Sequence, residues 1–171
     1  MGPVPSRWFV VFVFSVFVFF VFAVPARATQ ISGTISSTLT ISDDSELVGD
    51  VTCTVENGAC IVIGAPHVRL SLNGFTITGT IAGCSQSTSP DDGIAVTGEK
   101  DVAILGPGLI QGFGGFGILL LGDSKVKIKG VTISDNCFSG IILVGTTDSD
   151  IEKNVSIRNS LGSQGNPCGG T

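Results

Sequence analysis

Three copies of one short stretch decide the fold: Gly93-Ile94-Ala95-Val96, Gly117-Ile118-Leu119-Leu120 and Gly140-Ile141-Ile142-Leu143. The copies follow one another at intervals of 24 and 23 residues. A second pattern, in which aliphatic residues alternate before a glycine, occurs as Val102-x-Ile104-x-Gly106 and Val126-x-Ile128-x-Gly130. Alternation of this kind is typical of short β-strands. Because strands that recur at a fixed interval stack on one another, the interval predicts a solenoid.

The turns between the strands support this interpretation. Two sets of residues at equivalent places in the period consist only of Gly, Asn and Asp: Gly74, Gly106, Gly130 and Asn154, and Gly79, Gly112, Asp135 and Asn159. These residue types tolerate left-handed backbone angles at little steric cost, so they predict two fixed corners in each coil. We therefore predict an all-β fold with about 24 residues and three short strands per coil.

Three runs of the chain resemble those of a known class: Leu70 to Gly79, Ile104 to Gly112 and Asp135 to Ile141. They look like repeats of right-handed parallel β-helix proteins of the pectin-lyase-like superfamily, and the resemblance covers about residues 47–171. It implies a right-handed parallel β-helix. Similar repeats occur in secreted carbohydrate-active proteins and in periplasmic NosD-like proteins. The matching residues build the coil, so the resemblance leaves the function open.

The N-terminal segment has the pattern of a secretory signal. Arg7 precedes an apolar run from Trp8 to Val24 that only Ser15 interrupts, and Ala26-Arg27-Ala28 follows. We predict a signal peptide over residues 1–28, cleaved after Ala28, and a β-helix domain over residues 29–171. The alternative is an uncleaved anchor, although the run is shorter than the roughly 20 residues that span a bilayer. A cleaved chain has no stable membrane span, and either form is exported: secreted, periplasmic or at the cell surface.

The C-terminal run from Pro167 to Thr171 is similar to the approach to another Gly-Ile strand. A bare last coil exposes unpaired backbone groups. We therefore expect the β-helix domain to be truncated at its C-terminal end.

All five cysteines lie in the predicted exported part, which suits an oxidising compartment. Cys53 and Cys60 flank a turn signal, so we predict a local disulfide between them. Cys137 and Cys168 would lie close together on adjacent coils, which predicts a second disulfide. Cys84 lies in a loop inserted between coils and has no obvious partner. A zinc site is disfavoured because the chain has no C-x-x-C motif and only one histidine.

One strand carries a row of basic side chains. Lys125, Lys127 and Lys129 alternate with apolar residues and are therefore expected to point outward. The row could attract an acidic polysaccharide, but ordinary solvation of an outer face explains it equally simply, and we favour that explanation. Nucleic acid is excluded as a partner because the net charge is −5.

Other candidate site residues lie in loops. Phe113 and Phe116 flank a pair of glycines and are the best candidates for exposed aromatic contacts to a sugar. Asp91 and Asp92 are candidate metal ligands, although aspartate is also a standard turn residue, which we consider the better interpretation. His67 follows a proline at a turn, and no nucleophile motif accompanies it.

These observations predict a secreted β-helix scaffold or binding domain without a catalytic site or a cofactor. The expected partner is a polysaccharide or a cell-surface glycan. Two alternatives stay open: the chain forms the N-terminal coils of a carbohydrate-active polysaccharide lyase or glycoside hydrolase, or it is a NosD-like periplasmic maturation factor.

Overall fold

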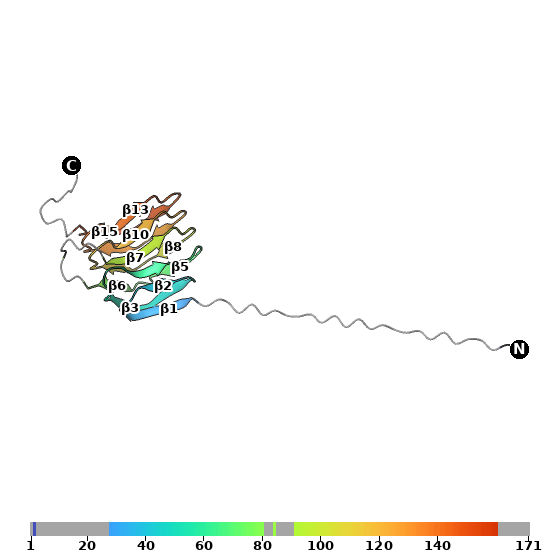
Figure 1. Cartoon of the computed structure of the whole chain (residues 1–171). Coiled ribbons are helices and arrows are strands. Elements are labelled where there is room, and N and C mark those ends of the chain that lie inside the picture. The colour runs from blue at the N-terminus through green and yellow to red at the C-terminus, as the bar shows by residue number, and fades with distance from the viewer. Residues whose placement is uncertain (1, 3–27, 81–83, 85–90, 161–171) are drawn as a thin grey trace.

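The computed structural model describes residues 2, 28–80, 84 and 91–160, and all regular secondary structure in these ranges is β. The strands form a stack of coils in which each strand lies on the equivalent strand of the coil before it (Figure 1). All strand pairs in these ranges are parallel. The predicted all-β parallel coil is therefore confirmed. The predicted signal peptide lies outside the described residues, apart from Gly2 and Ala28.

Each coil has three sides, which we call the first, second and third faces. The first face contains β2 (Leu39–Ile41), β4 (Ala59–Ile63), β7 (Asp92–Thr97), β10 (Ile118–Leu121) and β13 (Ile141–Val144). The second face contains β5 (Arg69–Ser71), β8 (Ala103–Leu105), β11 (Lys127–Lys129) and β14 (Asp150–Glu152). The third face contains β6 (Thr76–Gly79), β9 (Leu109–Gln111), β12 (Thr132–Ser134) and β15 (Val155–Ile157).

Two longer strands begin the stack. β3 (Ser45–Cys53) pairs with β5 through its first residues and with β6 through its last, so it spans the second and third faces. β1 (Thr29–Ile35) pairs with β3 along its length and forms the first layer. The segment before residue 50 therefore builds the N-terminal end of the solenoid.

The register confirms the interval read from the sequence. Ile118 lies opposite Ile94 on one side and Ile141 on the other, which are 24 and 23 residues away. Between β4 and β7 the interval is longer, and Ile61 lies opposite Ile94. The additional residues belong to the loop inserted before Asp92. Register is preserved across this insertion because a slip of one residue would turn the apolar side chains outward.

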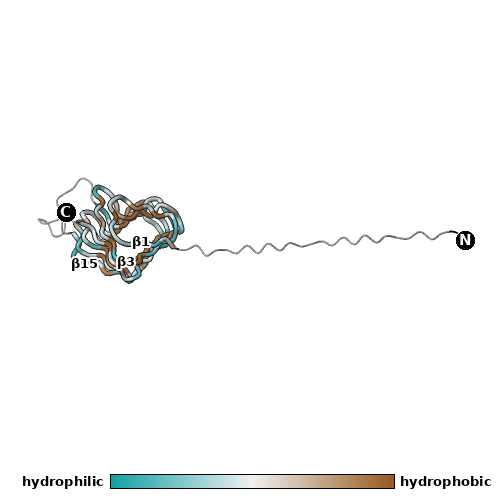
Figure 2. Tube along the Cα trace, turned by 90° about the horizontal axis from the view of Figure 1, so that it is seen from below, coloured by the Kyte–Doolittle hydropathy of each residue, from teal (hydrophilic) through white to brown (hydrophobic). Residues whose placement is uncertain are grey.

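The interior is filled by stacked aliphatic side chains. Ile94 and Ile118 of the first face, Ile104 and Ile128 of the second and Ile110 of the third are all 0% exposed. Figure 2 looks along the coil and shows the hydrophobic positions of successive coils superimposed around one axis. Each buried side chain of this size contributes about 1.5–3 kcal/mol, so the stack is the main source of stability.

The predicted corners are correct in part. Gly74, Gly112, Gly130 and Asp135 have positive φ angles. Gly106 does not, but a Cβ there would lie 1.9 Å from the Gly130 carbonyl oxygen, so close approach of two coils requires this glycine. In the last coil the left-handed residues are Lys153 and Arg158 rather than Asn154 and Asn159. The reason is a 23-residue step, which places Val155 opposite Thr132.

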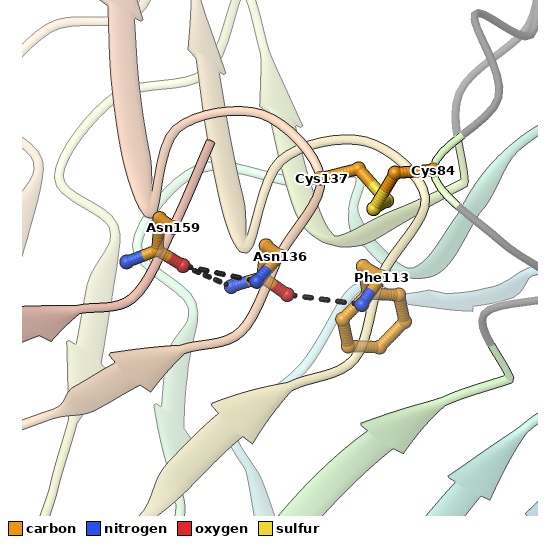
Figure 3. The surroundings of a disulfide bond; sticks show 5 residues. All are labelled: Cys84, Phe113, Asn136, Cys137 and Asn159. Atoms are coloured by element: carbon orange, nitrogen blue, oxygen red, sulfur yellow. Dashed lines mark hydrogen bonds between the residues drawn. A yellow bond between two sulfur atoms is a disulfide. The ribbon is translucent and has the colours of Figure 1, made fainter. Parts of the chain in front are cut away.

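The disulfides confirm one predicted bridge and correct the other. Cys53 is bonded to Cys60, as predicted. Cys137 is bonded to Cys84, so the predicted bridge between Cys137 and Cys168 is wrong (Figure 3). Cys168 itself lies outside the described residues. Cys84 precedes β7 and Cys137 precedes β13, so the bond joins positions two coils apart that the local period does not relate.

No segment in the described ranges forms a helix that could span a membrane.

Candidate functional site

The outer side of the first face is apolar over several coils. Val62, Ala95, Leu119 and Ile142 stand in one outward row across β4, β7, β10 and β13. In the neighbouring row, Leu121 is 42% exposed. This surface has no array of hydrogen-bonding groups, so it is poorly suited to a polar ligand.

The second face carries the predicted basic row, and two of its three lysines form ion pairs. Lys127 Nζ lies 2.7 Å from Asp150 Oδ2 and 3.2 Å from Glu152 Oε1, and Lys129 Nζ lies 2.8 Å from the same Glu152 oxygen. The hydrogen bonds that Lys127 donates to Asp150 and then to Glu152 raise the pKa of Lys127. Hydrogen bonds from Lys129 and then Lys127 lower the pKa of Glu152.

The position of these acids corrects one expectation about the row. From the sequence, acidic residues of the preceding coil, Glu99 and Asp101, were equally available to neutralise the row, whereas the ion pairs come from β14 on the following coil. The outer member, Lys125, lies before β11 at a corner, where its φ is 55°. Paired charges of this kind attract a polyanion less than a free basic row does. The geometry therefore favours the solvation interpretation.

The third face carries one outward row of uncharged polar side chains. Thr34, Thr52, Thr78 and Gln111 stand in one outward row across β1, β3, β6 and β9. Gln111 Nε2 lies 3.5 Å from Thr78 Oγ1. Strands in such a sheet are about 4.8 Å apart, so the polar groups of this row repeat at about that spacing.

We call this surface the hydroxyl face and define it by six outward residues: Thr34, Thr52, Thr54, Thr76, Thr78 and Gln111. Each of these side chains both donates and accepts hydrogen bonds. A Thr-x-Thr pattern recurs in the sequence at Thr52 and Thr76, and it could have indicated this face. The pattern alone does not say which strands lie side by side, so it does not predict the row.

The candidate aromatic pair does not lie on an exposed surface as predicted. Phe113 is only 1% exposed and lies inside the corner beside Asn136, whose side-chain oxygen accepts a hydrogen bond from the Phe113 backbone at 3.0 Å (Figure 3). Phe116 is half-buried, and its ring centre lies 5.5 Å from that of Phe138. The prediction failed for Phe113 because its loop turns inward at the corner, where an apolar side chain covers the interior.

Asp91 and Asp92 bind backbone amides of neighbouring coils. Asp92 Oδ1 accepts a hydrogen bond from the Phe116 backbone at 2.8 Å, and Asp91 Oδ1 accepts one from Asn57. Burial raises the pKa of Asp92, and the bond from Phe116 partly opposes this. The described residues contain no group of three or more His, Cys, Asp or Glu side chains placed to hold a metal ion. These contacts support a role in the turns.

A further polar site lies where the first and second faces meet at the N-terminal end. A cavity of about 640 Å³ is lined by Ala28, Thr29, Ser42, Asp43, Asp44 and His67, among others, and we call it the corner cavity. His67 Nδ1 lies 3.4 Å from Asp101 Oδ2. The sequence analysis did not connect these residues, although the 24-residue interval between Asp43 and His67 is a signal that could have placed them at one corner.

These features define the class of the protein as a parallel β-helix whose three outer faces are apolar, charged and hydroxyl-bearing. A family model described as "Right handed beta helix region" matches residues 40–169. The chain belongs to this family, and its coil is right-handed. Comparison with the curated proteins and with the solved structures found no match.

Proposed function

We propose that this protein is an exported β-helix domain that binds an uncharged polysaccharide or cell-surface glycan along its hydroxyl face. The observation that carries the proposal is the row of Thr34, Thr52, Thr78 and Gln111, which repeats a hydrogen-bonding group on each of four successive layers. A polymer of sugar units also repeats its hydroxyl groups along its length. Several contacts form at once, so a long chain binds more tightly than a short oligomer does.

Two features support export. The predicted signal over residues 1–28 directs the chain out of the cytoplasm. The disulfides Cys53–Cys60 and Cys84–Cys137 form and persist in an oxidising compartment. The periplasm, the medium and the cell surface all meet this condition.

The charge pattern favours an uncharged ligand over an acidic one. The net charge of the chain is −5, and the ion pairs of Lys127 and Lys129 occupy the best-placed basic groups of the second face. A polyuronate would be repelled by the molecule as a whole. The six side chains that define the hydroxyl face carry no charge, and the charged group beside them is Asp50, whose Oδ1 accepts the Thr76 backbone N–H at 2.8 Å. A neutral sugar chain that contacts the six side chains therefore removes no water from an ion.

The experiment uses the full chain, expressed with its own N-terminal segment and purified after export. Binding to insoluble neutral polysaccharides and to a polyuronate is measured by sedimentation. The double variant Thr52→Val/Thr78→Val keeps the shape of the face but removes two hydroxyl groups, and we expect at least a tenfold loss of binding. Thr40→Val on the first face is the matched control and keeps full binding.

The proposal fails if no neutral polysaccharide is retained, or if Thr40→Val reduces binding as much as the double variant does. Soluble sugar products are measured in the same tubes. Their release would support the alternative of a carbohydrate-active enzyme and would contradict a purely binding function.

A further inference from the structure

Thr29 lines the corner cavity at the N-terminal end of the stack. Its backbone N–H donates a hydrogen bond to the carbonyl oxygen of Asp44 at 2.9 Å. Thr29 is the first residue of β1, and its partner in the register is Ser45. Ala28 lines the same cavity. The peptide bond between Ala28 and Thr29 is the one at which the sequence predicts cleavage.

We infer that cleavage after Ala28 creates an α-ammonium group on Thr29 that is bound in the corner cavity by Asp43 and Asp44, and that this contact completes the first layer of the β-helix. The inference rests on the export component of the proposed function. It does not depend on the ligand of the hydroxyl face.

The chemistry of the cleavage supplies the charge. A signal peptidase hydrolyses the amide with water: the hydroxyl of the water joins the carbonyl carbon of Ala28, and the nitrogen of Thr29 gains a proton to become an amine. Near neutral pH this amine binds a further proton. The group then has three N–H donors in place of one, and Ala28 has left the space beside them.

The acceptors for these donors are already present. One donor keeps its bond to the Asp44 carbonyl oxygen. Asp43 and Asp44 line the same cavity as Thr29, so their carboxylates are the acceptors that we assign to the other two donors. The carboxylate of Asp44 is held in place because its Oδ1 accepts the backbone N–H of Arg69 at 2.8 Å. Hydrogen bonds between ionised partners are about twice as strong as those between neutral partners.

The charges around the cavity favour a positive group. Asp43 and Asp44 come from the corner before β3, and His67 comes from the equivalent corner of the next coil, where it faces Asp101. The side chain of Arg69 is exposed. Two carboxylates line the cavity, and the described residues of its lining include no Lys or Arg side chain.

The direction of the pH dependence follows from this arrangement. The carboxylates are expected to raise the pKa of the Thr29 amine in the folded chain above the ordinary value of about 7.7–8.0. A raised pKa of a basic group stabilises the fold below the unfolded value, and this stabilisation is lost as pH rises through the folded value.

The test compares two forms of the exported protein. The first is the processed chain, whose first residue is determined by mass spectrometry and is expected to be Thr29. The second keeps Ala28 as its first residue, which moves the charge by one position. At pH 7 we expect the second form to melt about 2–4 °C lower, which corresponds to roughly 1 kcal/mol for a chain of this size. At pH 10.5, where both amines are neutral, we expect the difference to vanish.

Substitutions in the cavity complete the test. Asp43→Asn and Asp44→Asn should each reduce the difference between the two forms at pH 7, because they remove a charged acceptor. Asp148→Asn is the matched control, since Asp148 occupies an exposed corner position in the last coil and should leave the difference unchanged. Equal melting temperatures of the two forms, a difference that persists at pH 10.5, or a mature chain that begins elsewhere than Thr29 would overturn the inference. Retention of polysaccharide is measured separately, so failure here is distinguishable from failure of the proposed binding function.

Discussion

The side-chain oxygen of Asn159 accepts two hydrogen bonds from Asn136, one from its backbone N–H at 3.2 Å and one from its side-chain amide at 2.9 Å. Asn136 in turn accepts a bond from the Phe113 backbone at 3.0 Å, and its side chain is 0% exposed. Figure 3 shows the three residues in line at one corner of successive coils. The corner is thus stabilised by a buried ladder of amides in which each polar group has a partner.

This ladder predicts a large cost for Asn136→Ala. The variant leaves the backbone N–H of Phe113 without its acceptor, and a buried unsatisfied group costs about 1–3 kcal/mol. It also removes the side-chain donor to the Asn159 oxygen, which keeps only the backbone N–H of residue 136. We expect the free energy of unfolding, measured by urea denaturation, to fall by at least about 2 kcal/mol. Ser36→Ala, at an exposed position, is the control. A loss no greater than that of the control would contradict the structural role of the ladder.

The two disulfides are expected to differ in their contribution. Cys84 and Cys137 are 53 residues apart, whereas Cys53 and Cys60 are 7 residues apart. By loop-closure entropy the longer loop stabilises the fold by about 4 kcal/mol and the shorter by about 2 kcal/mol. The double variant Cys84→Ala/Cys137→Ala should therefore melt at a lower temperature than Cys53→Ala/Cys60→Ala. A non-reducing digest that links Cys137 to any residue other than Cys84 would contradict the pairing.

Neighbouring residues of β10 offer a direct test of the register. Ile118 points into the core and Leu119 points outward. Ile118→Ala should cost about 2–5 kcal/mol, because it removes apolar contacts and leaves a cavity. Leu119→Ala should cost much less, because its side chain is only half-buried. Equal losses in thermal or chemical unfolding would be incompatible with the strand orientation.

Asp92 predicts an unusual dependence of stability on pH. Its side chain is 7% exposed, and burial raises its pKa. A carboxyl group whose pKa is raised in the folded state destabilises the fold at neutral pH, and this cost disappears as pH falls through the folded value. Asp92→Asn keeps an oxygen for the Phe116 N–H but carries no charge. We expect the variant to melt above the wild type at pH 7 and at the same temperature near pH 3. A lower melting temperature at pH 7 would contradict this account.

The ion pairs of the second face predict that removing the paired carboxylates leaves Lys127 and Lys129 as free positive charges. Asp150→Asn/Glu152→Gln removes the carboxylates that lie beside Lys127 and Lys129. Retention of the protein on a polyuronate should rise, with a marked dependence on ionic strength, because the charges are exposed and screened by salt. Asp148→Asn changes the net charge at a nearby corner without freeing this row and is the control. Unchanged retention would mean that the lysines do not act as a row.

Much of the fold could be predicted from residues that recur at the interval of the coil. The spacing of Ile94, Ile118 and Ile141 determines both the interval of the coil and the side of each strand that is buried. Gly74 and Gly130 mark corners because a left-handed backbone excludes most other residues. The predictions failed where the period slips: the shorter last coil places Asn154 opposite Val131, where its side chain accepts a hydrogen bond from the Val131 N–H.

The pairing and exposure of the candidate site residues could not be predicted, because they depend on contacts between different coils. Cys84 is bonded to Cys137, 53 residues further along the chain, although no repeat of the period relates the two positions. Lys127 meets Asp150, and Thr52 meets Thr78, only once the strands are stacked. By itself the sequence therefore determined the period, the buried positions and the corners, since these depend on backbone geometry and hydrophobic burial within a single turn of the chain. Only the tertiary structure decided which charges are paired, which aromatic ring is covered and which hydroxyl groups form one surface, because those properties belong to side chains that lie about 5 Å apart in space and a whole coil apart in sequence.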